Sequence, residues 1–223
     1  MAATNPFFDI SLLPYQAPRF DEINDSHYRP AFDEALRQKR ADIEAIVAQN
    51  AAPDFNNTVL ALEKSGVMLT RVSSVFFAMT SAHTNAYLQE LEEQFSTELA
   101  ALANDIWLND TLFDRVESVW QDRAALDAES RRLVEETYQR FILAGARLNE
   151  TEKAELKALN TEAASLTSQF NQRLLAADKT GGLVVDYAHQ LDGLSATEIA
   201  DAAQAAAERG LNDRWLIPLL NTT

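Results

Sequence analysis

The sequence of 223 residues contains no cysteine, which excludes disulfide bridges and zinc sites built on thiolates. Glycine and proline are also scarce, with six of each, while alanine, leucine, glutamate and glutamine are abundant. Because these abundant residues are strong helix formers, the composition predicts a mainly α-helical protein. Hydrophobic residues make up 47% of the chain, which is typical of a globular protein with a buried core.

Basic residues are in the minority, since 19 lysines and arginines stand against 34 aspartates and glutamates. The clustered cations that bind nucleic-acid phosphates or anionic membranes are therefore lacking, so we expect neither partner. The simpler interpretation of the net charge of −15 is a solvated acidic surface, and the alternative is attraction of cationic peptides. Apolar runs stay below the roughly 20 residues that cross a bilayer. Residues 1–6 lack the features of a signal peptide, so we expect a cytoplasmic location.

Three regions follow one another along the sequence: an extended lead-in over 1–25, a helical bundle over 26–178, and a small α+β segment over 179–223. Prolines exclude a helix in the lead-in, whose apolar residues are numerous enough to dock on a surface. These apolar residues are Phe7, Phe8, Leu12, Leu13, Tyr15 and Phe20.

Apolar residues at intervals of three and four predict six helices in the bundle, which we expect to be elongated. Ser26 is the expected N-cap of the first helix, Gly145 the C′ residue of the fifth, and Asn149 with Glu152 a capping pair for the sixth. The expected helices cover 26–49, 57–80, 85–106, 109–120, 127–144 and 149–178. The aromatic residues at helical spacing are expected in the core: Phe76, Phe77, Phe95, Phe113, Trp120, Tyr138, Phe141 and Phe170.

The last region has a different pattern, with two short apolar segments over 183–187 and 215–220 on either side of a helix. Ser195 and Glu198 form a capping box at the start of this seventh helix, and Gly210 ends it. The apolar segments predict two strands paired in a small ribbon, with Pro218 restricting the second to a sheet edge. The chain ends directly after this strand, from which we expect a longer natural polypeptide, truncated here at its C-terminal end.

A search for catalytic chemistry finds no candidate residue. The three histidines, His27, His83 and His189, form no His-Glu-x-x-His pair, so each is better explained as a surface or helix-end residue. A Gly-x-Ser-x-Gly elbow is absent, and Gly181-Gly182 is an isolated pair typical of a turn. Neighbouring carboxylates on a helix point to different faces, so such pairs predict no acid–base dyad. These pairs are Asp21-Glu22, Glu92-Glu93 and Glu135-Glu136. We therefore predict no catalytic, cofactor-binding or metal-binding residue in this chain.

Residues 54–66 carry a different kind of signal. They read Asp-Phe-Asn-Asn-Thr-Val-Leu-Ala-Leu-Glu-Lys-Ser-Gly, which resembles the N-terminal region of the thimet-oligopeptidase-like zinc metallopeptidases. Other segments resemble the same family in the same order, and those at 5–21 and 164–175 fit its peptidyl-dipeptidase branch. The further segments lie at 27–35, 74–85, 140–148, 170–172, 191–194 and 215–219.

The resemblance implies a fold and a function that the residues alone do not. Members of this family are mainly helical, two-lobed enzymes around a deep channel, and this chain would form one wall. The full-length parent would release C-terminal dipeptides from short peptides with a zinc-activated water. The family's zinc ligands lie in its C-terminal half, so we expect this chain to be inactive without that missing half as its partner, and to hold no zinc itself.

Two other hypotheses stay open at this point. The chain could be a free-standing helical module that binds or organises another protein, for which its acidic surface would be suited. It could also be the N-terminal part of an oligopeptidase of the same family that cuts within peptides. Under the first hypothesis of a dipeptidase parent, we expect the isolated chain to expose apolar surface where its missing half would pack.

Overall fold

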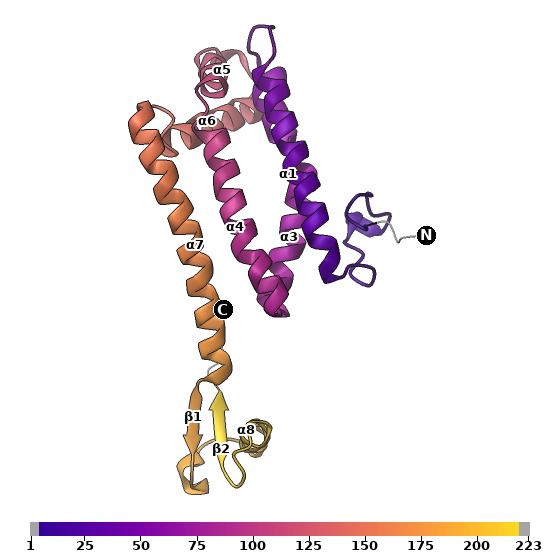
Figure 1. Cartoon of the computed structure of the whole chain (residues 1–223), viewed down its shortest axis with the longest axis vertical. Coiled ribbons are helices and arrows are strands. Elements are labelled where there is room, and N and C mark those ends of the chain that lie inside the picture. The colour runs from indigo at the N-terminus through magenta and orange to yellow at the C-terminus, as the bar shows by residue number, and fades with distance from the viewer. Residues whose placement is uncertain (1–4, 219–223) are drawn as a thin grey trace. The chain divides into compact units, whose positions relative to one another are not determined.

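A computed structural model describes residues 5–218, except for the side chains of 178–180. The chain forms two compact units, one up to residue 166 and the other from residue 167. The described part contains seven α-helices of twelve or more residues and one two-stranded antiparallel sheet (Figure 1). The prediction of a mainly α fold with a small ribbon is therefore confirmed, while the predicted boundaries at 25 and 178 stay predictions. Within the described residues, no helix is long and apolar enough to span a membrane.

Helix α1 covers Asp25–Val47 and begins one residue earlier than the sequence predicted. Asn24 is its N-cap, and the ring Nδ1 of His27 accepts a hydrogen bond from the backbone N–H of Asn24 at 3.2 Å. The prediction of Ser26 as the N-cap is wrong, because Ser26 lies in the first turn and donates its hydroxyl to the Asn24 side chain. The prediction missed an asparagine two residues earlier that caps equally well.

The predicted second helix, from 57 to 80, is interrupted. A π-helical turn, η2 (Phe55–Leu60), leads into the short helix α2 (Ala61–Lys64), and α3 (Val67–Ala82) follows after a break. Ser65 is extended at the break, and Gly66 adopts a left-handed backbone with φ of 74°. Because this region favours glycine, the Ser-Gly dipeptide is the signal for the break that helical periodicity concealed.

Helices α4 (Ala86–Trp107), α5 (Asp110–Gln121) and α6 (Ala128–Leu143) lie close to their predicted positions. Each begins at a side chain that accepts a backbone N–H, namely Asn85, Asn109 and Asp127. Gly145 follows the end of α6 with φ of 96°, which confirms its prediction as the C′ residue.

The core of the first unit lies where α1, α3 and α4 pack side by side and continues where α5 packs on α6 (Figure 1). Phe32 of α1 stacks on Phe95 of α4, with ring centroids 3.8 Å apart, and Phe76 of α3 meets Phe95 edge-on at 4.7 Å. Phe141 of α6 contacts Trp107 at the end of α4 in the same edge-on way. The prediction that the aromatic residues of these helices form the core is confirmed.

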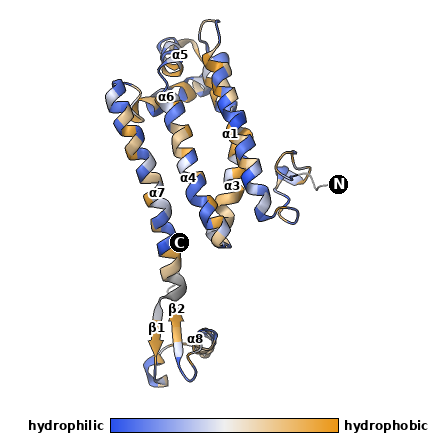
Figure 2. Cartoon of the chain, viewed as in Figure 1, coloured by the Kyte–Doolittle hydropathy of each residue, from blue (hydrophilic) through white to orange (hydrophobic). Residues whose placement is uncertain are grey.

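Helix α7 covers Glu150–Thr180 and begins at the predicted capping pair, since Asn149 and Glu152 each accept the other's backbone N–H at 3.0 Å. Hydrophilic and hydrophobic segments alternate along this helix (Figure 2). Phe170 is mostly exposed, so its prediction as a core residue is wrong. The other large apolar side chains of its stripe are also substantially exposed: Leu159, Leu166 and Leu174. Within its own unit, each of these side chains lacks a covering element among the described residues, which is the physical reason for the error.

The second unit contains the ribbon and helix α8. Strand β1 (Gly182–Val185) pairs antiparallel with β2 (Trp215–Pro218), with Leu183 opposite Ile217. Between the strands lie a 3₁₀ turn, η4 (Ala188–Leu191), and α8 (Ala196–Glu208), whose start is the predicted capping box of Ser195 and Glu198. The predicted ribbon is thus confirmed, although the last two residues of its predicted second strand lie outside the described residues.

Candidate functional site

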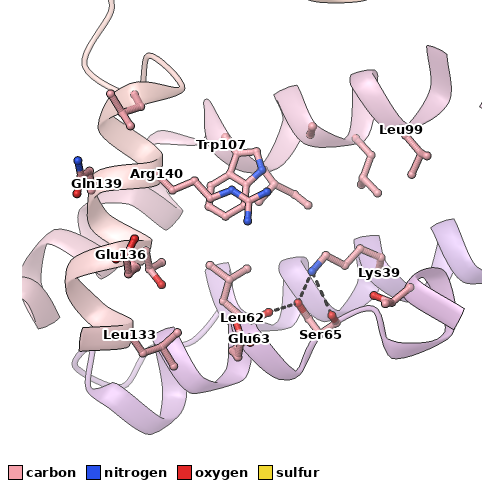
Figure 3. A pocket seen from close by; sticks show the side chains of 16 residues that line it. Lys39, Leu62, Glu63, Ser65, Leu99, Trp107, Leu133, Glu136, Gln139 and Arg140 are labelled. Atoms are coloured by element: carbon pink, nitrogen blue, oxygen red, sulfur yellow. Dashed lines mark hydrogen bonds between the residues drawn. The ribbon is translucent and has the colours of Figure 1, made fainter. Parts of the chain in front are cut away.

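A cavity of about 740 Å³ lies among α1, α2, α3, α4 and α6 of the first unit (Figure 3). Apolar and polar side chains line it in similar numbers, and the charged ones come from α1, α2 and α6. The residues that define it are Lys39, Leu62, Glu63, Ser65, Leu99, Trp107, Leu133, Glu136, Arg140 and Leu143. None of the three histidines lines this cavity.

Lys39 crosses from α1 to the break between α2 and α3. Its ammonium group donates hydrogen bonds to the hydroxyl and the backbone oxygen of Ser65, while the Ser65 hydroxyl donates to the backbone oxygen of Leu62. Burial lowers the pKa of Lys39, and the neighbouring Arg140 lowers it further, against the opposing influence of Asp42. The lysine therefore fastens the break and keeps a partly desolvated positive charge at the cavity wall.

Arg140 enters the cavity from α6 and lies over the indole of Trp107, with its guanidinium carbon 4.2 Å from the ring centroid. This cation–π contact holds the guanidinium beside the indole, and Arg140 and Lys39 face the same space (Figure 3). Two carboxylates, Glu63 and Glu136, also line the cavity, and Glu136 forms an ion pair with Arg132. The cavity thus combines an apolar wall with charges of both signs.

This arrangement is suited to binding and offers little for catalysis. The Ser65 hydroxyl already donates to a backbone oxygen and has no histidine or carboxylate base hydrogen-bonded to it. The ammonium group of Lys39 donates to both oxygens of Ser65, so it serves to hold the fold together. An activated nucleophile needs an adjacent base that is itself oriented by a third group, and the described lining residues do not supply one.

The residues singled out in the search for chemistry lie at helix ends, as expected. His27 forms part of the capping arrangement of α1, His83 is the C-cap of α3, and His189 lies in η4 beside the ring of Tyr187. Among the described residues, no group of three or more histidines and carboxylates could hold a metal ion. These described residues therefore do not form a zinc site.

The neighbouring carboxylates of α4 point to different partners. Glu92 accepts a hydrogen bond from the Thr80 hydroxyl of α3 at 3.4 Å, and burial raises its pKa. Glu93 accepts one from Ser165 of α7 at 3.2 Å. The two side chains of this pair therefore reach different neighbours, as adjacent side chains on a helix do, while the absence of a catalytic dyad stays a prediction.

Residues 54–66 take a structural role that the sequence only partly revealed. The side chain of Asp54 accepts a hydrogen bond from the backbone N–H of Asn57 at 2.7 Å and so caps η2. The amide oxygen of Asn57 in turn accepts a hydrogen bond from the backbone N–H of Asp54 at 3.0 Å. The amide oxygen of Asn57 also accepts a hydrogen bond from Arg115 of α5 at 3.0 Å.

The sequence did not reveal the role of Arg115, because a buried arginine on an amphipathic helix cannot be told from an exposed one by its sequence pattern. Its guanidinium also donates to the backbone oxygens of Gln49 and Ala51 in the loop after α1. This single side chain therefore joins α5 to that loop and to η2. Its position beside Val116 on the buried face of α5 was the available signal.

Comparison with curated proteins identifies peptidases as relatives of this chain, while no protein-family model matches it. Oligopeptidase A of Escherichia coli is 27% identical over 221 residues, which cover 97% of this chain and 31% of that protein. The similarity is much higher for two proteins named dipeptidyl carboxypeptidase. The Salmonella typhimurium protein is 67% identical over 223 residues, and the Escherichia coli protein is 65% identical over 225 residues.

The chain spans about a third of the length of these relatives, because each alignment covers 99–100% of the chain and 33% of the dipeptidyl carboxypeptidase. The resemblance to the thimet-oligopeptidase-like peptidases and their peptidyl-dipeptidase branch, predicted from the sequence, is confirmed by this pattern of identity.

Proposed function

We propose that this chain is the N-terminal region of a zinc-dependent peptidyl-dipeptidase, which releases C-terminal dipeptides from short peptides. The observation that carries the proposal is the identity of 65–67% with two dipeptidyl carboxypeptidases along the whole chain. The lower identity of 27% with an oligopeptidase A favours this branch over an oligopeptidase that cuts within peptides. The cytoplasmic location stays a prediction.

Within such an enzyme, the role of this chain would be to form one wall of the substrate channel. The first unit supports this role, because α1, α3, α4, α5 and α6 share one core, while Leu159 and Leu166 on its part of α7 stay more than half exposed. A stripe of this kind is stable in a complete protein when a further element covers it. The remaining two thirds of the parent polypeptide would supply that cover.

Zinc would be held by residues of the parent outside this chain, since the described residues do not form a site for it. When bound there, the metal would supply a nucleophilic hydroxide for peptide hydrolysis. The residues of this chain would act by shape: a rigid wall admits a short peptide and excludes a folded protein.

The direct test compares the full-length protein encoded by the reading frame with the 223-residue chain. Both are incubated with zinc and an N-terminally blocked tripeptide, and products are identified by mass spectrometry. The proposal predicts release of the C-terminal dipeptide by the full-length protein and no turnover by the chain. Zinc-dependent turnover by the chain alone would contradict it.

The same experiment distinguishes a peptidyl-dipeptidase from an oligopeptidase that cuts within peptides. With longer peptides, a peptidyl-dipeptidase shortens each substrate by two residues at a time from the C-terminus. Internal fragments of other lengths, formed before any dipeptide, would favour an oligopeptidase that cuts within peptides.

The scaffold hypothesis makes a different prediction for the isolated chain. A complete binding module would remain monomeric and bind little hydrophobic dye, whereas a separated channel wall exposes the stripe on α7 and binds the dye. Sedimentation and dye fluorescence on the purified chain distinguish these outcomes.

A further inference from the structure

The N-terminal arm, which we define as residues 8–20, places large apolar side chains in solvent. Leu12 is 100% exposed, and Tyr15 is fully exposed as well, in the turn of residues 13–17 that we call the tip of the arm. Four others are between 46% and 63% exposed, namely Phe8, Ile10, Leu13 and Phe20. Single exposed apolar residues are ordinary on protein surfaces, but six within thirteen residues form a patch that needs a partner.

The base of the arm is firmly held by the first unit. Phe7 is buried against Tyr28 of α1, with ring centroids 5.6 Å apart, and its backbone oxygen accepts a hydrogen bond from Arg71 of α3. Arg19 donates to the backbone oxygen of Pro6 at 3.1 Å, and the amide of Asn5 donates to the backbone oxygen of His27 at 2.8 Å. The arm is therefore held at both of its ends, by the buried Phe7 and by Arg19.

The backbone at the tip of the arm is strained. Tyr15 and Gln16 both adopt left-handed conformations, with φ of 58° and 57°. Residues other than glycine enter this region at a cost, because the Cβ atom crowds the following carbonyl oxygen. Such strain persists when surrounding contacts over-determine the conformation. Within the described residues, the contacts at the tip are two turn hydrogen bonds, from Gln16 to Leu13 and from Ala17 to Pro14.

We propose that the arm docks on the part of the parent polypeptide that follows residue 223, and so clasps the N-terminal wall to the remainder of the enzyme. The two dipeptidyl carboxypeptidases align with 99–100% of this chain, and each is about three times as long as the chain. The proposal rests on the proposed function, because it requires that remainder to exist. An apolar pocket on it, sized for Leu12 and Tyr15, would bury the patch and hold the strained tip.

Hydrogen exchange tests the docking on the full-length protein and on the 223-residue chain. Amides of residues 10–17 are expected to exchange at least about tenfold more slowly in the full-length protein, since docking protects them. Equal exchange rates in the two proteins would overturn the proposal.

A pair of substitutions provides the matched control. Leu12→Asp is expected to lower the melting temperature of the full-length protein by a few degrees and to leave that of the 223-residue chain unchanged, because Leu12 is uncovered there. Leu12→Met keeps the apolar side chain and should leave both proteins unchanged. An equal effect of Leu12→Asp on both proteins, or no effect on either, would overturn the proposal.

The outcomes also distinguish this proposal from the function it rests on. Dipeptide release by the full-length protein without any effect of Leu12→Asp would overturn the docking alone. Protection of the arm in a full-length protein without peptidase activity would support docking and contradict the proposed function. If Leu12→Asp instead dissociates an oligomer and leaves exchange in the full-length monomer unchanged, the arm covers a second copy and the proposal fails.

Discussion

Helices α4 and α7 carry nearly the same sequence pattern and have opposite surroundings. Both place large apolar residues at intervals of three and four over several turns. Leu91 of α4 is 4% exposed, whereas Leu159 and Leu166 of α7 are each 56% exposed. The difference lies in what each stripe meets: α4 packs against α1 and α3, while within the first unit no described element covers Leu159 and Leu166 of α7.

Polar contacts join the first part of α7 to its neighbours in the first unit. Lys153, whose side chain is buried, forms an ion pair with the exposed Asp110 at the start of α5, and the amide of Asn160 donates to Asn104 of α4 at 2.7 Å. An amphipathic helix normally turns its apolar side toward its neighbours. Here polar side chains anchor the helix and leave the apolar side outward, as expected if it meets a further part of the polypeptide.

The largest effect is expected from truncating matched leucines on the two helices. Leu91→Ala should reduce the free energy of unfolding by about 2–5 kcal/mol, because it removes buried methyl groups and leaves a cavity. Leu159→Ala should change it by less than about 0.5 kcal/mol, because that side chain is already in solvent. Urea denaturation of the 223-residue chain measures both. Equal losses would show that the α7 stripe is buried in solution and would break the comparison.

A second contrast concerns buried and exposed arginines. Arg115→Met should cost about 2–4 kcal/mol, because the backbone oxygens of Gln49 and Ala51 and the amide of Asn57 lose their shared donor. Arg132→Met is the control, since Arg132 is exposed and should matter by less than about 0.5 kcal/mol. Denaturation curves measure the loss of unfolding free energy for both variants. A small loss for Arg115→Met would show that Asn57 and the loop after α1 keep their places without the arginine.

A smaller effect is expected at the break before α3. Gly66→Ala should cost about 1–2 kcal/mol for the left-handed backbone. A further cost is expected in addition to this backbone strain, because the new Cβ would lie 2.6 Å from Cδ of Lys39. In a Lys39→Ala background the extra part should disappear, so a double-mutant cycle isolates the contact. Additive effects would indicate that Lys39 moves aside freely.

The smallest effect concerns an exposed ion pair on α1. Hydrogen bonds from Arg37 and, to a smaller extent, from Gln38 lower the pKa of Glu34 from 4.5 to about 2. Because the folded pKa lies below the unfolded one, the pair stabilises the fold above about pH 4.5 and loses this contribution as the pH falls toward 2. Arg37→Ala should raise the pKa of Glu34, measured by NMR titration, and Arg132→Ala should leave it unchanged. A Glu34 pKa unaffected by Arg37→Ala would contradict the assignment.

The sequence predicted those features that depend on local chemistry. Capping side chains such as Asn109 and Asp127 satisfy backbone N–H groups within one turn, so their positions could be read directly. Gly145 and the paired strands were predictable for similar reasons. Periodicity also identified the apolar sides of α1, α3, α4, α5 and α6.

What could not be predicted depends on partners that are distant or outside the described residues. The stripe of α7 and Phe170 look like core in sequence, because periodicity shows which residues share a face and not whether anything covers it. Arg115 was missed because its value comes from carbonyl oxygens more than sixty residues away. The cavity at Lys39 and Arg140 likewise depends on a break in a helix that periodicity had joined.

The absence of native cysteine allows the central claim to be tested by thiol labelling. Leu166→Cys on α7 and Leu88→Cys on α4 are compared in the native 223-residue chain and in the full-length protein, in which any further cysteines are replaced by serine. We predict fast labelling at 166 and slow labelling at 88 in the chain, with position 166 becoming slow in the full-length protein. Fast labelling at position 166 in both proteins would contradict the account, because it would show that the rest of the polypeptide leaves the α7 stripe uncovered.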